Sequence, residues 1–466
     1  MAITVAAFPV HGYHPGVEDA EIYLPGILKL VRPTLFPRNA EFFQSHAGMT
    51  LFPNVIAVSI RLTHTPVAFA MMGWQCLSIL WLLYACFRIA RLCFGSRGAW
   101  CGVALVAGLL TLPVAGTALY IVDQYVTSRS LSTPAAMLAI AFALEERYWH
   151  TGLLLVCTAL VHPLMSLFAG TFVVLYVTGQ RFNLVPALAH FSFFPPISGA
   201  YRRSLDEHPY FLLSNWAWYE WLGVVAPFAV LAAFVRVARR GEHGPLAAIC
   251  RTLIVFQTVF LGMAVFISVP GRFEYLSEIQ PLRSLHLLYC LMFLLGGGLL
   301  GEYVLRNHIW RWALLFIPLG TGMSYAQLQL FPSSPHLELP WRSCSNQWVQ
   351  TFEWIRRNTP EDAYFALDPE HATQPGEDQH GFRAIARRSM LADDGKDSGA
   401  VSMFPSLAAE WAQQVDARRN WKNFRRSDFA RLRQQYGVDW VILQDRQAAG
   451  MVCPYRNHDL RVCRVN

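Results

Sequence analysis

Charged residues are scarce in this chain of 466 residues. Lys, Arg, Asp and Glu make up 15% of the sequence, whereas hydrophobic residues make up 54% and aromatic residues 14%. Soluble domains usually contain about 25% charged residues, so this composition excludes an ordinary soluble protein and favours the bilayer as solvent. No basic tail or DNA-binding motif is present, and the formal charge of +7 comes with arginines clustered in short loops between apolar runs. We therefore expect no nucleic-acid partner.

Metal-ligand patterns are also lacking. No second histidine lies at metal-ligand spacing from His162, which argues against a zinc site. Asp393, Asp394 and Asp397 resemble part of a calcium loop but lack its spacing and its final Glu, so we interpret them as a solvated turn. Cys453 and Cys463 flank a segment that is a candidate hairpin, closed by a disulfide if it faces an oxidising compartment.

Long apolar runs are abundant. Five runs without formal charge are long enough to cross a hydrocarbon core of about 30 Å, and they cover residues 65–87, 99–122, 252–271, 284–301 and 312–330. A sixth, 216–235, spans if Glu220 lies at the interface. Between Leu131 and Tyr201 the apolar pieces are shorter and are broken at His162-Pro163 and Pro195-Pro196. Broken helices at membrane depth are tolerated where they line a wet cavity, so we expect a bundle of about eight to ten helices around a cavity.

Arginines in short loops predict the orientation. Four short loops that contain arginines fall on one side of the membrane if the short apolar pieces also cross it, and this side is then cytoplasmic. The arginines of these loops are Arg88, Arg91 and Arg97 in the first, Arg236, Arg239 and Arg240 in the second, Arg306 and Arg311 in the third, and Arg181 in a weaker fourth. We therefore expect a multi-pass membrane protein. Its parts are a first extracytoplasmic loop (1–63), a transmembrane bundle (64–330) and a soluble extracytoplasmic domain (331–466). The first ten residues are too short to span. Either the first segment is translocated without a leading helix or a preceding helix is missing, and we favour the missing helix.

The last part of the chain has the pattern of a small α/β domain. "NQWVQTFEWIRRN" predicts an amphipathic helix, and "AYFALDP" and "VDWVILQ" predict short buried strands. "SDFARLRQQYG" predicts a helix with Ser427 or Asp428 as its cap and Gly437 as its stop. The expected fold is mainly α, a polytopic transmembrane helix bundle with a small C-terminal α/β domain.

Several of these motifs together resemble those of bacterial multi-pass proteins related to the GT-C superfamily of membrane glycosyltransferases. They are "EDAEIYLPGILKLVRPTLFP", "VDQYVTSRSLSTP" and "LVHPLMSL", and in the last part "WIRRNTPEDAYFALDP", "GFRAIARRSMLADDGKD" and "LRQQYGVDWVIL". The resemblance covers most of the chain. It implies a lipid-linked donor such as a polyprenyl phosphate sugar, an acidic residue in the first outer loop, and an inverting transfer at the outer membrane face.

Carboxylates near residue 20 are the candidate catalytic groups. Inverting transfer of a sugar to a hydroxyl needs a carboxylate near the acceptor and cations that hold the departing phosphate. We expect Asp19 to be the base, with Glu21 or Glu18 second; a solvated or capping turn is the alternative. Arginines suffice for the phosphate, and a divalent cation is an optional cofactor.

Other polar residues predicted on or near the outer face are candidates for substrate binding. Asp123 is either a second acid or the partner of Arg129, and Arg129 either binds phosphate or reaches lipid headgroups. Ser132 or Thr133 is expected to cap the helix that follows. His162 is either functional or satisfied by a backbone carbonyl. Arg202, Arg203 and Arg272 suit an anionic headgroup, unless they pair with nearby acids such as Asp206, Glu207 and Glu274.

Three functions are compatible with these patterns. The first is a glycosyltransferase with a polyprenyl phosphate sugar donor and a glycan, lipid or protein acceptor. The second is a polysaccharide polymerase or ligase with lipid pyrophosphate donors. The third is a non-catalytic membrane protein or transporter; inverted repeats would favour transport, and none is evident. Charges gathered at one face favour chemistry on a lipid-linked substrate.

Overall fold

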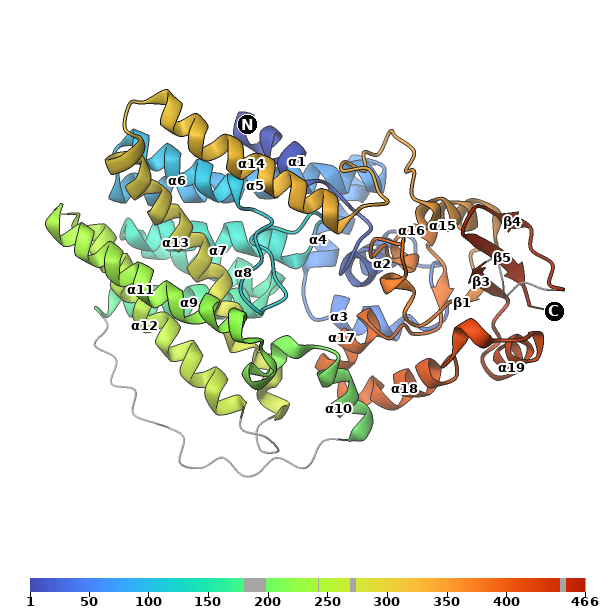
Figure 1. Ribbon diagram of the computed structural model, residues 1–466. Coiled ribbons are helices and arrows are strands. Elements are labelled where there is room, and N and C mark those ends of the chain that lie inside the picture. Colours follow the sequence, from blue (N-terminus) through green and yellow to red (C-terminus); the bar gives the residue numbers. More distant parts are fainter. Residues whose placement is uncertain (180–197, 242, 269–273, 445–449, 466) are drawn as a thin grey trace. The chain divides into compact units, whose positions relative to one another are not determined.

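The computed structural model describes residues 1–179, 198–241, 243–268, 274–444 and 450–465, and these form two compact units. Unit 1 comprises Met1–Gly12, Gly73–Ile197 and Pro209–Ala326, and unit 2 comprises Tyr13–Met72, Ser198–His208 and Gln327–Asn466. Both units are therefore assembled from segments that are far apart in the sequence (Figure 1).

Unit 1 is a bundle of apolar helices. They are α1 (Ala2–His11), most of α5 (Val67–Cys93), α6 (Ser96–Gly108), α7 (Ser128–Leu144), α8 (Tyr148–Val161), α9 (Pro163–Val177), α11 (Trp218–Arg240), α12 (Gly244–Ile267), α13 (Leu285–Leu299) and most of α14 (Ile309–Leu330). Among the described residues, four helices are long and apolar enough to cross a membrane: 67–93, 218–240, 244–267 and 276–305. They agree with the predicted runs 65–87, 252–271 and 284–301, and with the run 216–235 that was predicted to span only if Glu220 lies at the interface.

The predicted span 99–122 is wrong as a single helix. α6 ends at Gly108, and the chain then turns until Thr127, with an isolated bridge between Pro113 and Tyr120. Pro113 has no N–H to donate to a helix, and Ala115 and Ala118 have left-handed φ values of 47° and 54°. The run 312–330 is continuous, as α14, but α14 is not among the four candidate spans.

The predicted break at His162-Pro163 is confirmed. α8 ends at Val161 and α9 begins at Pro163, while His162 has extended backbone angles and its Nδ1 accepts the Met165 N–H at 3.4 Å. A residue before proline disfavours the helical region, so the chain changes direction here. The break predicted at Pro195-Pro196 and the loop at Arg181 lie outside the described residues.

α6 packs closely in unit 1 against α13 and the π-helical turn Leu300–Leu305 that continues it, because glycines four residues apart occur on both sides of the contact. A Cβ on Gly297 would lie 2.8 Å from the Gly102 Cα, and a Cβ on Gly301 would lie 3.0 Å from the Gly98 Cα. Such pairs of small residues let helix backbones approach closely in membranes. The chain forms this contact through two GxxxG patterns, Gly98–Gly102 and Gly297–Gly301.

Unit 2 contains a five-stranded mixed sheet with the order β2-β1-β3-β5-β4. The strands are β1 (Tyr364–Ala366), β2 (Ser389–Met390), β3 (Trp440–Gln444), β4 (Tyr455–Arg456) and β5 (Leu460–Arg464). β1 is parallel to β2 and β3, whereas β5 is antiparallel to β3 and β4. Cys453 and Cys463 form a disulfide, the bond that the sequence allows only on the condition of an oxidising compartment.

Helices cover both faces of this sheet, since its strands alternate their buried side chains. Phe365 and Ile442 contribute to one core with α15 (Gln347–Asn358), while Ala366 and Val441 contribute to another with α19 (Arg426–Tyr436). The predicted strands and helices of this α/β domain are confirmed. Gly437 stops α19 with φ 74°, but the N-cap is Arg425, and Asp428 accepts the backbone N–H of Arg425.

The remaining helices of unit 2 come from earlier in the chain or connect the strands. They are α2 (Ala20–Val31), α3 (Glu41–Ala47), α4 (Phe52–Thr63), α10 (Gly199–Asp206), α16 (Phe382–Ala386), α17 (Lys396–Met403) and α18 (Ala408–Asp416). α2 packs against α3, α4 and α16, and α10 packs against α17 and α18. The segment 13–63 is therefore a folded part of unit 2.

Candidate functional site

The acidic stretch lies at the start of α2. Asp19 is the residue before the helix, and its carboxylate does not cap the helix N-terminus. Lys396 reaches both partly exposed acids: its Nζ is 3.4 Å from Asp19 Oδ1 and also contacts Glu18. Glu18 has a left-handed φ of 53°, a conformation that non-glycine residues adopt rarely and often at functional sites. The stretch is thus a constrained turn with two carboxylates facing one ammonium group.

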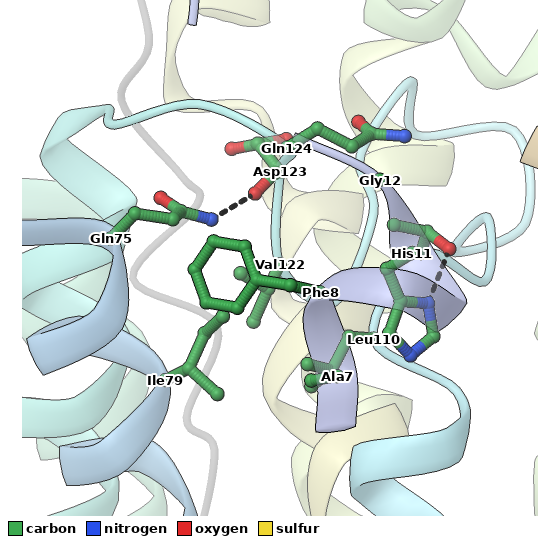
Figure 2. A pocket seen from close by; sticks show the side chains of 11 residues that line it. Ala7, Phe8, His11, Gly12, Gln75, Ile79, Leu110, Val122, Asp123 and Gln124 are labelled. Atoms are coloured by element: carbon green, nitrogen blue, oxygen red, sulfur yellow. Dashed lines mark hydrogen bonds between the residues drawn. The ribbon is translucent and has the colours of Figure 1, made fainter. Parts of the chain in front are cut away.

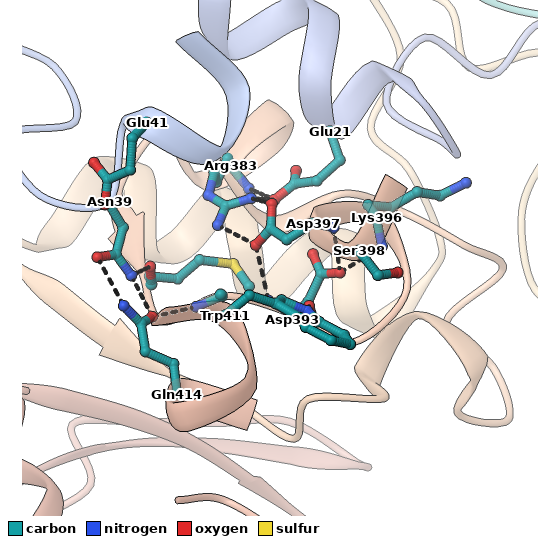
Figure 3. Close-up of polar contacts among 12 residues, drawn as sticks. Glu21, Asn39, Glu41, Arg383, Asp393, Lys396, Asp397, Ser398, Trp411 and Gln414 are labelled. Atoms are coloured by element: carbon teal, nitrogen blue, oxygen red, sulfur yellow. Dashed lines mark hydrogen bonds and ion pairs between the residues drawn. The ribbon is translucent and has the colours of Figure 1, made fainter. Parts of the chain in front are cut away.

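Glu21 has a different environment from the other two acids. Its side chain is buried, and its two oxygens accept the backbone N–H groups of Arg383 and Ala384, both at 3.0 Å. Figure 3 shows Glu21 beside Arg383. The Arg383 guanidinium lies 3.5 Å from the same carboxylate and forms two further hydrogen bonds with Asp397, at 2.9 and 2.7 Å. Glu21 therefore joins α2 to the start of α16 through a buried polar network.

Burial controls the ionisation of this network. Removal from water raises the pKa of Glu21 from 4.5 to about 8, although the Arg383 guanidinium and two backbone N–H groups oppose the rise. Burial likewise raises the pKa of Asp397, against the attraction of Arg383. One buried guanidinium thus faces two carboxyl groups, and protonation of Glu21 at neutral pH leaves the Arg383–Asp397 pair balanced in charge.

The "ADDGKD" segment is not the solvated turn that its sequence suggests. Asp393 and Asp397 are buried, and Asp393 Oδ1 accepts the backbone N–H groups of Lys396 and Asp397 at the start of α17. Asp394 is only partly exposed and pairs with Arg203 at 3.2 Å. The physical reason is the neighbouring Arg383, which provides a buried partner for Asp397.

The two arginines of α10 have different surroundings. Arg203 pairs with Asp394 and with Asp416 at 2.8 Å, and its guanidinium lies over the Trp411 ring at 5.0 Å. Arg202 is more exposed and lies 3.6 Å from Asp206. The predicted alternative, pairing with nearby acids, therefore holds for Arg202 with Asp206, while Arg203 pairs with acids of the C-terminal part of the chain.

A second polar group lies in unit 1, at the start of α7. Arg129 and Asp123 are both buried and form an ion pair at 2.8 Å, so Asp123 is a partner of Arg129. Thr127, not Ser132 or Thr133, is the N-cap residue: its backbone N–H donates to the Ser130 hydroxyl at 3.0 Å, and its own hydroxyl donates to Asp123 at 3.2 Å. Helix α7 begins earlier than predicted because Thr127 already forms the capping hydrogen bond with Ser130. Pro134 therefore lies inside α7.

Two small cavities adjoin Asp123. One is lined by His11, Gln75, Ile79 and Asp123, among others, and Gln75 donates to the Asp123 backbone carbonyl at 2.6 Å (Figure 2). The other is lined by Asp123, Arg129 and Thr133. Gln75 Oε1 and Thr133 Oγ1 are buried without a hydrogen-bond partner among the described residues. Such unsatisfied polar atoms are rare in folded proteins and mark a place where a ligand group or water is expected.

The other predicted site residues are less informative. His162 is half-buried at the break between α8 and α9, where its imidazole caps α9. Arg272 lies outside the described residues. Within the described parts of the chain, no group of three or more His, Cys, Asp or Glu side chains is arranged to hold a metal ion.

Three contributors to these sites were missed from the sequence. Lys396 and Arg383 occur in the quoted segment "GFRAIARRSMLADDGKD" but were not singled out, and Gln75 is the single amide in the apolar run 65–87. A lone amide in a long apolar run is a signal that could have identified Gln75. Nothing in the sequence identifies Arg383 as the one arginine that reaches Glu21.

Comparisons with solved structures identify the fold. The crystal structure of ArnT from Cupriavidus metallidurans bound to undecaprenyl phosphate matches with a TM-score of 0.50 and 14% identity, over 100% of this chain and 97% of that chain. The apo oligosaccharyltransferase of Archaeoglobus fulgidus matches with a TM-score of 0.45 and 10% identity, over 95% and 69%. The same protein in complex with Zn and sulfate has a TM-score of 0.41 and 12% identity, over 95% and 67%.

No protein-family model matches the chain, and no curated protein matches its sequence. The match to ArnT extends over nearly all of both chains, so the likeness concerns the whole architecture. The chain has the GT-C fold, a polytopic helix bundle with a C-terminal α/β domain. It is a multi-pass membrane protein by this fold and by its apolar helices.

Proposed function

We propose that the protein is a membrane glycosyltransferase that uses a polyprenyl phosphate sugar as donor. The observation that carries this proposal is the likeness in fold to ArnT over the whole length of the chain, because that neighbour was crystallised with undecaprenyl phosphate. The acceptor is a hydroxyl group of a glycan, a lipid or a protein. The reaction takes place at the outer face of a bacterial inner membrane.

Asp19 is the proposed general base. The acceptor hydroxyl attacks the anomeric carbon of the sugar, a new C–O bond forms there, and the bond from that carbon to the phosphate oxygen breaks. The phosphate leaves with the electron pair, the hydroxyl proton passes to the Asp19 carboxylate, and the anomeric configuration inverts. Glu18, which shares Lys396 with Asp19, is the second candidate, whereas the backbone bonds of Glu21 support a structural role.

Cations are needed where the phosphate departs. Arg129 is proposed to bind it; its pairing with Asp123 keeps the guanidinium oriented at the start of α7, and the unsatisfied Thr133 hydroxyl lines the same cavity. His162, Arg202, Arg203 and Arg272 remain proposed substrate-binding residues. A divalent cation remains an optional addition to them.

The outer location of the C-terminal part is also a proposal. A disulfide between Cys453 and Cys463 supports it, because disulfides persist in oxidising compartments. The boundaries proposed from the sequence are a first outer segment (1–63), a membrane bundle (64–330) and an outer domain (331–466).

The test is transfer of radiolabelled sugar from a polyprenyl phosphate donor in membranes that contain the full chain or its Asp19→Asn variant. We expect the variant to lose activity by roughly 10²–10⁴-fold, the usual contribution of a general base. The matched control is Asp362→Asn, at an exposed position of unit 2, which is expected to keep full activity.

Two results contradict the proposal in distinguishable ways. Undiminished transfer by the Asp19→Asn variant excludes Asp19 as the base but keeps the transferase. Transfer by the wild type from a lipid pyrophosphate glycan alone, with none from the monophosphate donor, identifies a polymerase or ligase instead.

A further inference from the structure

A large open cavity lies at the other end of α7 from Arg129. It is formed where α7 ends, α8 begins, α9 ends and α12 begins, and its lining includes Glu146, Tyr148, Tyr176, Val177, Arg251 and Thr252. Its volume is about 370 Å³, within the range of ligand pockets. α7 has 17 residues, which at 1.5 Å per residue places this cavity about 25 Å from Arg129. It is therefore separate from the proposed transfer site.

Opposite charges line this cavity without neutralising each other. The Arg251 side chain is exposed, and its Nε donates to the Ala247 carbonyl at 3.1 Å. Glu146 is exposed in the turn after α7, where its left-handed φ of 61° sets the direction of its side chain. Among the described residues, neither group forms an ion pair. A ligand with an anionic and a cationic group fits this pair.

The surroundings of the cavity are typical of a membrane–water interface. Tyr148 and Trp149, at the start of α8, are 53% and 80% exposed, and Trp310, at the start of α14, is 59% exposed. Aromatic residues of this kind gather at the level of lipid headgroups. Arg147, Arg239, Arg240 and Arg311 also lie at helix ends of this side of the bundle. Leu144, Val177 and Ala248 add an apolar part to the lining, which suits the start of acyl chains.

We propose that this cavity binds the headgroup of a zwitterionic phospholipid that carries a phosphate and a primary amine. The Arg251 guanidinium donates to the phosphate oxygens, and the Glu146 carboxylate accepts from the ammonium group. Tyr148 and Tyr176 provide hydroxyl donors at the edge of the same space. Basic pockets between membrane helices bind lipid headgroups in other proteins. The site does not depend on the glycosyltransferase activity proposed above.

The test measures binding of short-chain phospholipids to the purified full-length protein in detergent. Dihexanoyl phosphatidylethanolamine is compared with the phosphatidylglycerol and phosphatidylcholine analogues, and with free phosphoethanolamine. We expect the ethanolamine lipid to bind best. Arg251→Gln is expected to weaken its binding by roughly tenfold, equivalent to ~1.4 kcal/mol. Glu146→Gln is expected to abolish the preference for ethanolamine over glycerol headgroups.

Arg239→Gln is the matched control, since Arg239 is exposed in the last turn of α11 and outside the cavity lining. An equal loss of binding in this control means that the bundle attracts lipid by total charge, which overturns the proposal. So does an Arg251→Gln variant that binds as the wild type does, or a Glu146→Gln variant that keeps the headgroup preference. Equal binding of free phosphoethanolamine overturns the assignment to a lipid. Thermal unfolding of each variant checks that the fold is intact.

Discussion

At the scale of single residues, burial separates the roles of three neighbouring carboxylates. Glu18 and Asp19 are partly exposed and contact Lys396, whereas Glu21 is buried and binds two backbone N–H groups and Arg383. The sequence predicts an acidic group at this point, with Glu21 or Glu18 second to Asp19, but it does not distinguish the environments of these two residues. The reason is that Arg383 follows Glu21 by more than 350 residues, and only the tertiary fold brings the two together.

The raised pKa of Glu21 predicts a dependence of stability on pH. The folded state keeps the Glu21 proton up to about pH 8, whereas the unfolded chain releases it near 4.5. The folded state therefore binds one proton more in this window, and the free energy of unfolding falls as pH rises from about 4.5 to 8. A Glu21→Gln variant lacks this titration, so its thermal midpoint is expected to fall less between pH 5 and pH 8 than that of the wild type.

Comparing how the thermal midpoint changes with pH in the wild type and in Glu21→Gln isolates the contribution of Glu21 from that of the other titrating groups. Burial lowers the pKa of His371 to about 4, which makes stability rise with pH between about 4 and 6.5, in both proteins equally. Glu353→Gln, at a surface pair of α15, is the matched control and is expected to keep the wild-type slope. Identical slopes for Glu21→Gln and the wild type would contradict the raised pKa.

Arg383 is the second residue whose replacement has a large predicted effect. It neutralises Asp397 through two hydrogen bonds in a site without solvent access, so Arg383→Gln leaves a buried carboxylate without a cation. Breaking a buried ion pair on one side costs about 3–5 kcal/mol. The expected result is a large drop in thermal midpoint. Arg357→Gln removes an exposed pair with Glu353 and is expected to cost about 1 kcal/mol or less; equal effects would contradict the structural role of the network.

At the scale of elements, the sequence predicts helices better than their ends. The apolar runs 65–87 and 252–271 correspond to α5 and α12, and the break at His162-Pro163 is confirmed because proline acts locally. The span 99–122 fails because apolar composition does not report the turn at Pro113. The predicted N-cap of α7 is wrong for a similar reason. Several hydroxyl residues in "VTSRSLST" are suitable N-cap residues, and packing selects Thr127 among them.

The contact between α6 and α13 gives a prediction at this scale. A Cβ at position 297 meets the backbone of α6, at 2.8 Å from the Gly102 Cα and 2.9 Å from the Cys101 carbonyl oxygen. Backbone atoms cannot move aside as a flexible side chain can, so Gly297→Ala must separate the two helices. Overpacking of this kind costs about 1–3 kcal/mol, measurable as a lower thermal midpoint in detergent.

Gly262→Ala on α12 is a matched control for this substitution. No heavy atom lies within 4 Å of a Cβ built at Gly262, so alanine meets open space there. Alanine is favoured over glycine in a helix interior by about 1 kcal/mol, and the control is expected to unfold at the wild-type temperature or slightly above it. If both variants lose stability equally, close approach of α6 and α13 is not the cause.

At the scale of the whole molecule, the two compact units are interleaved along the chain. Unit 2 gathers 13–72, 198–208 and 327–466, whereas composition suggests contiguous parts that change near residues 63 and 330. Composition reports the solvent that a segment prefers, but not which distant segments share a core. The sequence therefore predicts that the polar residues of α2 and α10 share one face. It does not identify their ion-pair partners in the C-terminal part of the chain.

The proposed orientation leads to a prediction for the intact protein in cells. Arg239 and Arg240, in the last turn of α11, predict the cytoplasmic side, and the disulfide of the β4–β5 region favours an oxidising compartment for the C-terminal part. A cysteine introduced at Asp459, exposed between β4 and β5, is expected to react with a membrane-impermeant maleimide in intact spheroplasts. A cysteine introduced at Arg239 is expected to react only after lysis, and the chain without either substitution measures the background from its own thiols. Labelling of both positions before lysis, or of Arg239→Cys alone, would reverse or exclude this orientation, and with it a transfer reaction at the outer face.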